Sequence, residues 1–136
     1  MTTSYRKPAP LQIRLDAVPG SVPRARTALA GYAREVGAPA DDVELAVAEA
    51  TSNAILHAFT SREPGNLDLR AEIAGGELQV TVADDGDGMR PHPQGGGLGL
   101  GLALIGQMTT SLTIKRPAGG GTEVRMMFPI AEGSSG

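Results

Sequence analysis

The chain has 136 residues, of which 40% are hydrophobic and 20% charged, as expected for one domain spanning residues 1–136 with about 10–130 folded. Its formal net charge of -3 gives no electrostatic footprint for direct nucleic-acid binding, and the absence of Cys excludes disulfides and thiolate metal sites. Because no apolar run approaches the ~20 residues of a membrane span and the first ten residues contain no secretory signal, we expect a cytoplasmic protein without membrane contacts.

The first part of the chain predicts one strand followed by two helices. Residues 11–15 alternate apolar and polar side chains, which is the period of a half-buried strand. A helix is expected over 21–37, with its first residue, a serine, as N-cap and its last, a glycine, as the stop signal. A second helix is expected from 39 to about 59, and Asp41 and Glu44 have the spacing of a capping box at its start.

The second part of the chain predicts four strands and one helix. Residues 67–73 and 78–83 alternate as strands on either side of a Gly-Gly turn, which is typical of a hairpin. A glycine-rich loop leads to a helix that starts near Gly99, and strands follow at 112–114 and 122–128. This order predicts a two-layer α/β sandwich with helices over one face of a mixed, mostly antiparallel sheet.

The second helix carries a polar stripe. Glu49, Asn53 and His57 are spaced four residues apart, so their side chains project from one side of the helix. A polar stripe on an amphipathic helix usually faces solvent, and a histidine near a helix end is more often structural than catalytic. The stripe alone therefore does not identify a site.

A turn rich in aspartate and glycine follows the second strand of the hairpin. Asp84 could accept a hydrogen bond from a ring amine, and Gly86 and Gly88 let the chain turn sharply and a ligand approach closely. The alternatives are a solvated turn and a calcium loop. Met89 and Arg90 occupy positions where a calcium loop needs an oxygen ligand and a glycine, so calcium is excluded.

A run of glycines precedes the last helix. Gly95, Gly96, Gly97, Gly99 and Gly101 lie where free N–H groups and the helix dipole favour phosphate. The run has neither the spacing of the dinucleotide-binding fingerprint nor the Gly-Lys pair of a P-loop. By itself, such a run is also compatible with a flexible linker.

Together the motifs resemble a known family. In order along the chain they resemble the N, G1, G2 and G3 boxes of GHKL ATPases and kinases, which have the Bergerat ATP-binding fold: Glu49-x-x-x-Asn53, Asp84-x-Gly86-x-Gly88, Gly97-x-Gly99-x-Gly101 and Gly120-Gly121-Thr122. Within that family, residues 49–58 and 99–105 most resemble bacterial anti-sigma factor serine kinases.

The resemblance implies a nucleotide-binding role for each box. Asn53 would offer its amide oxygen to Mg²⁺, and Asp84 would accept a hydrogen bond from the adenine amine, with Thr122 completing that end of the pocket. Residues 90–94 would form a mobile lid. The other nucleotide-binding residues implied are Gly86, Gly88, Gly97, Gly99, Gly101 and Leu102. The cofactors implied are ATP and Mg²⁺.

The resemblance also implies a reaction. Glu49 resembles the family's general base, which accepts the proton of a protein seryl hydroxyl as that hydroxyl attacks the γ-phosphate. The function implied is an ATP-dependent anti-sigma regulatory factor with serine/threonine-protein kinase activity. Such a protein phosphorylates a STAS-type anti-sigma factor antagonist, sequesters a sigma factor and forms a homodimer.

Three other functions are compatible with parts of the pattern. A non-catalytic module, in which ATP only shapes a protein-docking surface, would use every one of these nucleotide residues. A sensor histidine kinase would need a helical phosphoacceptor domain upstream, and a gyrase-type or chaperone-type ATPase would need further domains, so we expect neither. The non-catalytic module is therefore the main alternative.

Two features bear on protein partners. The sequence Thr109-Thr110-Ser111 stands where the anti-sigma subfamily leads us to expect an acidic residue. Three arginines on the first helix could meet an acidic partner, although exposed arginines are usually just solvated: Arg24, Arg26 and Arg34.

Overall fold

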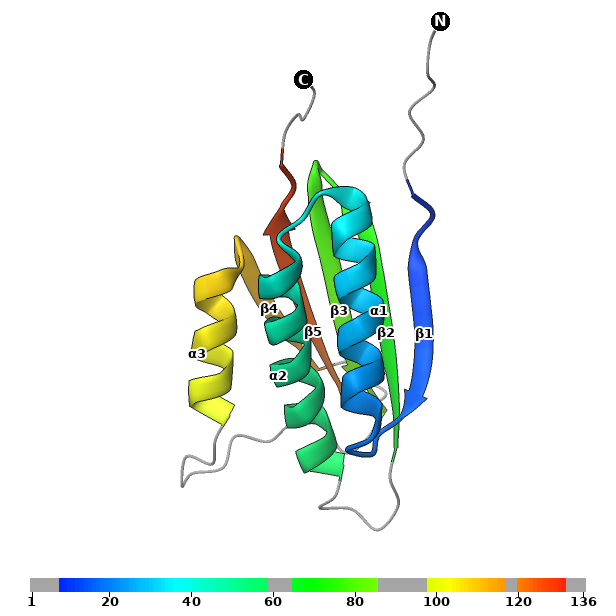
Figure 1. Cartoon of the computed structure of the whole chain (residues 1–136). Coiled ribbons are helices and arrows are strands. Elements are labelled where there is room, and N and C mark those ends of the chain that lie inside the picture. The colour runs from blue at the N-terminus through cyan, green and yellow to red at the C-terminus, as the bar shows by residue number, and fades with distance from the viewer. Residues whose placement is uncertain (1–7, 59–64, 86–97, 117–119, 132–136) are drawn as a thin grey trace, which may run out of the picture.

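The computed structural model has a sheet layer and a helix layer (Figure 1). It describes residues 8–58, 65–85, 98–116 and 120–131, with only the backbone described at 57–58 and 98–102. The elements, in chain order, are β1 (Leu11–Asp16), α1 (Ser21–Val36), α2 (Ala40–Ala58), β2 (Asn66–Ala74), β3 (Glu77–Asp84), α3 (Leu98–Met108), β4 (Ser111–Lys115) and β5 (Thr122–Pro129). This order confirms the predicted succession of strands and helices. Within the described residues, no helix is long and apolar enough to cross a membrane.

The five strands form one sheet in the order β1-β2-β3-β5-β4. All four strand pairings are antiparallel, so the described strands contain no parallel pair of the kind that a mixed sheet has. The β2–β3 hairpin turns at Gly75 and Gly76, whose φ angles of 61° and 79° are those of a turn that other residues rarely adopt. The two-layer sandwich predicted from the sequence is confirmed.

All three helices cover the same face of the sheet (Figure 1). Strand alternation turns every second side chain toward them, and the inward side chains are apolar and buried. On the three central strands these residues are Leu67, Leu69, Ala71, Leu78, Val80, Val82, Val124, Met126 and Phe128. The helices contribute mainly short side chains: Ala25, Ala33, Ala46, Ala50 and Ala54 are each buried. The opposite face of the sheet carries polar and charged side chains.

The start of α1 differs from the sequence prediction. The N-cap residue is Gly20, and Ser21 is the first helical residue. No side chain forms a capping hydrogen bond at this end of the helix. The main-chain N–H groups of Ser21 and Val22 donate to the carbonyls of Val18 and Pro19 at 2.9 and 3.1 Å, so the preceding turn satisfies the first N–H groups of the helix without a capping hydroxyl. The predicted end is confirmed, because Gly37 has the left-handed φ of 85° that a glycine C-cap adopts.

The capping box predicted at the start of α2 does not form. Asp41 is the second residue of the helix and so cannot be its N-cap. The carboxylate of Glu44 instead pairs with Arg26 of α1 at 3.2 Å. This ion pair joins the two helices and gives one of the three α1 arginines a partner within the chain.

Candidate nucleotide site

The elements that carry the sequence motifs meet at one end of the molecule. Helix α2 packs against β3, β5 and α3. The end of β3, the start of β5, the C-terminal part of α2 and the start of α3 all lie at the lower end in Figure 1. Segments separated by up to about seventy residues in sequence are thereby brought together by the sheet order rather than by chain proximity.

Asp84 and Thr122 are the last and first residues of neighbouring strands and pair directly in the β3–β5 register. Each continues the inward row of its strand, because Val82 and Val124, two residues further into the sheet, are buried beneath the helices. Thr122 is 1% exposed, whereas Asp84 is only partly buried. The carboxylate therefore lies at the rim of the covered face and the hydroxyl lies deeper.

The chain approaches Asp84 closely at Gly121. This glycine has a φ of 84°, and a Cβ at this position would overlap the carbonyl oxygen of Asp84. The same atom would lie 3.1 Å from the Asp84 carbonyl carbon and 3.3 Å from the Cα of Asp85. Both the backbone angle and the contact therefore require glycine. The glycine pair before Thr122 fits β5 tightly against the end of β3.

Glu49 and Asn53 lie one helical turn apart on α2, and both side chains are partly buried. The amide nitrogen of Asn53 is buried and has no hydrogen-bond partner among the described residues. A buried donor without an acceptor costs about 1–3 kcal/mol, so this position fits an amide that binds a polar ligand. Asn53 is thus the described residue with the clearest unmet hydrogen-bonding capacity in the motif region.

The unpartnered nitrogen of Asn53 is a hydrogen-bond donor and cannot ligate a cation, so a Mg²⁺ ion would need the side-chain oxygen of this residue. Among the described residues, no group of three or more acidic or histidine side chains could hold a metal ion. A Mg²⁺ ion beside Asn53 would take most of its six oxygen ligands from water and the nucleotide, as this cation commonly does. The assignment of Asn53 as its protein ligand remains a prediction.

Several predicted site residues cannot be compared with the structure. Gly86, Gly88 and Gly97, and the lid expected at 90–94, lie outside the described residues. Gly99 and Gly101 fall within the first turn of α3, which starts at Leu98, so the predicted helix start near Gly99 is confirmed. Amide groups of a first helical turn have no intrahelical acceptor, as a phosphate site requires. The side chains of Leu102 and His57 lie outside the described part.

Sequence reasoning gave no role to Asp85, which the structure shows to be hydrogen-bonded. One carboxylate oxygen accepts the main-chain N–H of Asn66 at 2.7 Å, and the other accepts its side-chain amide at 3.1 Å. These bonds hold the pKa of Asp85 below its ordinary value of 3.8, with a smaller contribution from Arg14. The signal that was available is the alternation of β3, which must point two consecutive aspartates to opposite faces.

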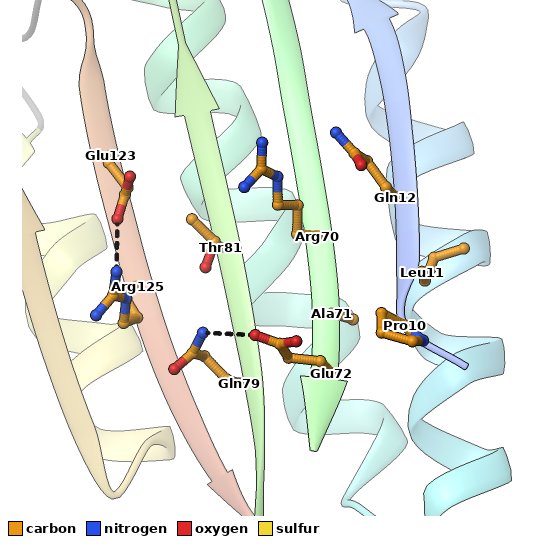
Figure 2. A pocket seen from close by; sticks show the side chains of 10 residues that line it. All are labelled: Pro10, Leu11, Gln12, Arg70, Ala71, Glu72, Gln79, Thr81, Glu123 and Arg125. Carbon is orange, nitrogen blue, oxygen red and sulfur yellow. Dashed lines mark hydrogen bonds and ion pairs between the residues drawn. The ribbon is translucent and has the colours of Figure 1, made fainter. Parts of the chain in front are cut away.

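A hollow on the open face of the sheet lies away from these residues (Figure 2). It has a volume of about 430 Å³ and none of the motif residues lines it. Its charged side chains include Arg125, which pairs with Glu123 at 3.0 Å, and Glu72, which accepts a hydrogen bond from Gln79 at 3.4 Å. The hollow is a polar depression in an uncovered sheet face and is separate from the nucleotide site.

Residues 15–128 match the histidine kinase-like ATPase domain. The match spans most of the chain and includes all four motifs. The chain belongs to this family. Membership implies ATP binding, and the GHKL resemblance of the motifs is confirmed.

The relatives of this ATPase domain include anti-sigma proteins. It is 35% identical over 80 residues to "Serine-protein kinase RsbW" of Bacillus velezensis, which covers 57% of this chain and 50% of the relative. It is 33% identical over 73 residues to "Anti-sigma F factor" of Clostridium botulinum, covering 52% and 51%. The chain thus spans about half the length of these curated relatives.

A solved structure supports the fold. The crystal structure of the RsbU and RsbW domains of a Mycobacterium tuberculosis protein superposes with a TM-score of 0.71 at 25% identity. The likeness covers 93% of this chain and 34% of that chain. The two-layer arrangement of the ATPase domain is therefore shared with a solved structure that contains an RsbW domain.

The structure gives a physical reason for one departure from the anti-sigma pattern. The hydroxyl of Thr110 lies 3.1 Å from a carboxylate oxygen of Glu77 and 3.2 Å from the carbonyl oxygen of Met127, both acceptors. An acidic side chain at this position would face a like charge and could not donate. Threonine therefore suits a chain that has glutamate at the start of β3.

Proposed function

We propose that this ATPase domain is an anti-sigma regulatory factor with serine/threonine-protein kinase activity that phosphorylates an anti-sigma factor antagonist and sequesters a sigma factor. The observation that carries the proposal is that α2, which bears Glu49 and Asn53, packs against β3 and β5, whose paired ends bear Asp84 and Thr122. The names of the relatives, a serine-protein kinase and an anti-sigma factor, support the choice of substrate class.

The proposed reaction transfers the γ-phosphoryl group of ATP to a seryl oxygen of the antagonist. Glu49 accepts the seryl proton as the oxygen forms its bond to phosphorus and the bond to the β-phosphate oxygen breaks, which releases ADP. Asn53, one turn away, would hold Mg²⁺, which neutralises charge on the phosphates. Such a reaction needs mainly positioning and charge neutralisation, so one base and one metal ligand from the same helix are a sufficient set.

The proposed adenine site is formed where β3 and β5 meet. Asp84 at the rim accepts a hydrogen bond from the exocyclic amine, and the buried Thr122 hydroxyl completes this end of the pocket directly or through water. Guanine carries an oxygen where adenine carries that amine, so Asp84 would select adenine. The phosphates would extend toward the first turn of α3.

The catalytic role of Glu49 is tested by Glu49→Gln, which keeps the shape of the side chain and removes the base. We expect phosphate transfer to a STAS-type antagonist to fall by about 10²-fold or more, with ATP affinity little changed. The matched control is Glu44→Gln on the same helix, whose carboxylate pairs with Arg26 rather than facing the site. Equal transfer rates by Glu49→Gln and the parent protein would rule out Glu49 as the base.

The non-catalytic module remains the second candidate, because it shares every nucleotide residue. In that case the parent protein binds ATP but transfers no labelled phosphate to any antagonist, and ATP changes only its affinity for a partner. Mass spectrometry of proteins that co-purify with the chain, with and without Mg-ATP, identifies the partner needed for either measurement.

The adenine assignment is tested by Asp84→Ala. We expect ATP affinity to fall by at least about tenfold and GTP affinity to change much less, because only adenine loses its acceptor. Calorimetric titration measures both. Unchanged ATP affinity would contradict the role proposed for Asp84.

A homodimer is also part of the proposal, and the open sheet face supports it. This face carries Arg70 and Arg125 beside Glu72 and Glu123, so two copies of it could place opposite charges against each other across a two-fold axis. Charge reversal by Arg70→Glu is expected to weaken self-association in analytical ultracentrifugation. The control Arg24→Glu, on the far side of the molecule in α1, should not.

A further inference from the structure

The two consecutive aspartates at the end of β3 have different surroundings. Asp84 continues the row of Leu78, Val80 and Val82 and so points to the face covered by the helices. Asp85 follows the opposite row and meets Asn66 at the start of β2. The same alternation that directs one carboxylate toward the nucleotide site directs the other away from it.

The carboxylate of Asp85 replaces a main-chain acceptor in the sheet. In an antiparallel ladder, the N–H of Asn66 would donate to the carbonyl of the residue opposite. Here it donates at 2.7 Å to Oδ1 of Asp85, while the main-chain N–H of Asp85 lies 3.4 Å from the Asn66 carbonyl oxygen. The side-chain bond and the main-chain bond therefore act together on the last residue pair between β2 and β3.

We propose that Asp85 is a positioning residue for adenine recognition: its carboxylate, bound by Asn66, fixes the end of β3 so that Asp84 points into the adenine site. This inference rests on the proposed function, in which Asp84 accepts the adenine amine. Asp85 does not touch the nucleotide in this role and acts only through the backbone that it shares with Asp84.

The neighbouring strand explains why this anchoring matters. On the β5 side, Gly121 lies against the Asp84 carbonyl with no room for a side chain. On the β2 side, the two bonds between Asp85 and Asn66 oppose any shift away from β5. The backbone of Asp84 is thus held from both sides at the point where β3 ends. Loss of either restraint should let the carboxylate move relative to the adenine.

The test compares four variants of the full chain. Asp85→Ala removes both side-chain bonds to Asn66 and leaves the main-chain bond between these residues. The exchange of the two residues, Asp85→Asn with Asn66→Asp, keeps an oxygen at 85 for the main-chain N–H and reverses the side-chain bond. Asp84→Ala removes the adenine acceptor itself. Asp68→Ala is the matched control, because this aspartate lies on the same open face and pairs with Arg70 instead.

Two measurements separate positioning from general stability. Calorimetry gives the Kd of each variant for ADP and for GDP, and NMR gives the hydrogen-exchange rate of the Asn66 amide. For Asp85→Ala we expect faster exchange, ADP binding weakened by about tenfold and a smaller preference for ADP over GDP. The variant with exchanged residues should recover most of the parent's ADP affinity and of its slow Asn66 amide exchange. Asp68→Ala should match the parent in both measurements.

The outcomes distinguish this inference from the proposed function. Faster Asn66 exchange in Asp85→Ala with unchanged ADP affinity would overturn the positioning role, as would an equal loss of ADP and GDP binding. If Asp84→Ala kept the parent's preference for ADP, the proposed adenine site would itself be wrong and the inference would fall with it. Recovery of ADP affinity by the variant with exchanged residues, together with its loss in Asp85→Ala and in the Asp84 variant, supports the inference.

Discussion

Replacement of Gly121 by alanine tests the closest backbone approach at the candidate site. The added methyl group would overlap the Asp84 carbonyl oxygen, and carbon and oxygen atoms in ordinary contact are more than ~3 Å apart, so the end of β3 must move by on the order of 1 Å. The left-handed φ of 84° adds a separate penalty of about 1–2 kcal/mol for any residue other than glycine. The substitution should therefore disturb both stability and the position of Asp84.

The β2–β3 turn provides a control with the same backbone angle and no contact. Gly76 has a φ of 79°, and a Cβ there would meet nothing within 4 Å. Gly76→Ala should thus cost only the backbone penalty, about 1–2 kcal/mol in the free energy of unfolding. Gly121→Ala should cost about 3 kcal/mol or more, because the overlap is added. The difference between the two variants isolates the contact with Asp84.

Urea denaturation gives the two free energies of unfolding, and calorimetric titration gives the ADP affinity of the folded variants. Under the proposed role of Asp84, Gly121→Ala also weakens ADP binding by about 10–10²-fold, since an error of about 1 Å in a binding group has effects of this size. Gly76→Ala should bind ADP as the parent does. Equal stability losses in the two variants would refute the close approach, and normal ADP affinity in Gly121→Ala would refute its link to the site.

Three further predictions concern stability. The pKa of Asp85 is lowered, so the carboxylate stabilises the folded state above the ordinary aspartate pKa range, and this stabilisation is lost as the pH falls through the lowered pKa. The Tm difference between the parent and Asp85→Asn should therefore shrink below about pH 4. Tyr32 is buried, and its hydroxyl has no partner among the described residues, so Tyr32→Phe should raise the free energy of unfolding by up to about 1 kcal/mol in urea denaturation; a loss of that size would reveal a partner. Thr110→Asp should lower the Tm through repulsion by Glu77, an effect that Thr110→Asn lacks and that added salt reduces.

Most of the fold follows from local patterns in the sequence. The first three strands alternate apolar and polar side chains because one face is buried and the other is not, and that alternation predicted them. The helix starts were less predictable, because several groups can satisfy the same free N–H. At Ser21 the preceding turn does so, and Glu44 pairs with Arg26 of the neighbouring helix, which no local pattern could indicate.

The candidate site was predictable as a set of motifs but not as a geometry. The spacing of Glu49 and Asn53 defines one helix face, and the family resemblance connects it with Asp84. The contact of Gly121 with the end of β3 and the binding of Asp85 by Asn66 depend on which strands are neighbours. Strand order is set by the packing of the whole sheet, so these two restraints appear only in three dimensions.

The candidate site lies where the side chains that face the helices change from apolar to polar. On β3 and on β5 this change falls at the same pair of opposite residues. Val82 pairs with Val124 beneath the helices, and the next inward pair toward the end of the sheet is Asp84 with Thr122. Since both strands change at one register position, the polar pair shares its backbone with the core directly beneath it. A shift of β3 relative to β5 by one residue would turn Asp84 to the open face and misalign the core at the same time. The packing that makes the sheet stable therefore also fixes the position of the carboxylate proposed to select adenine.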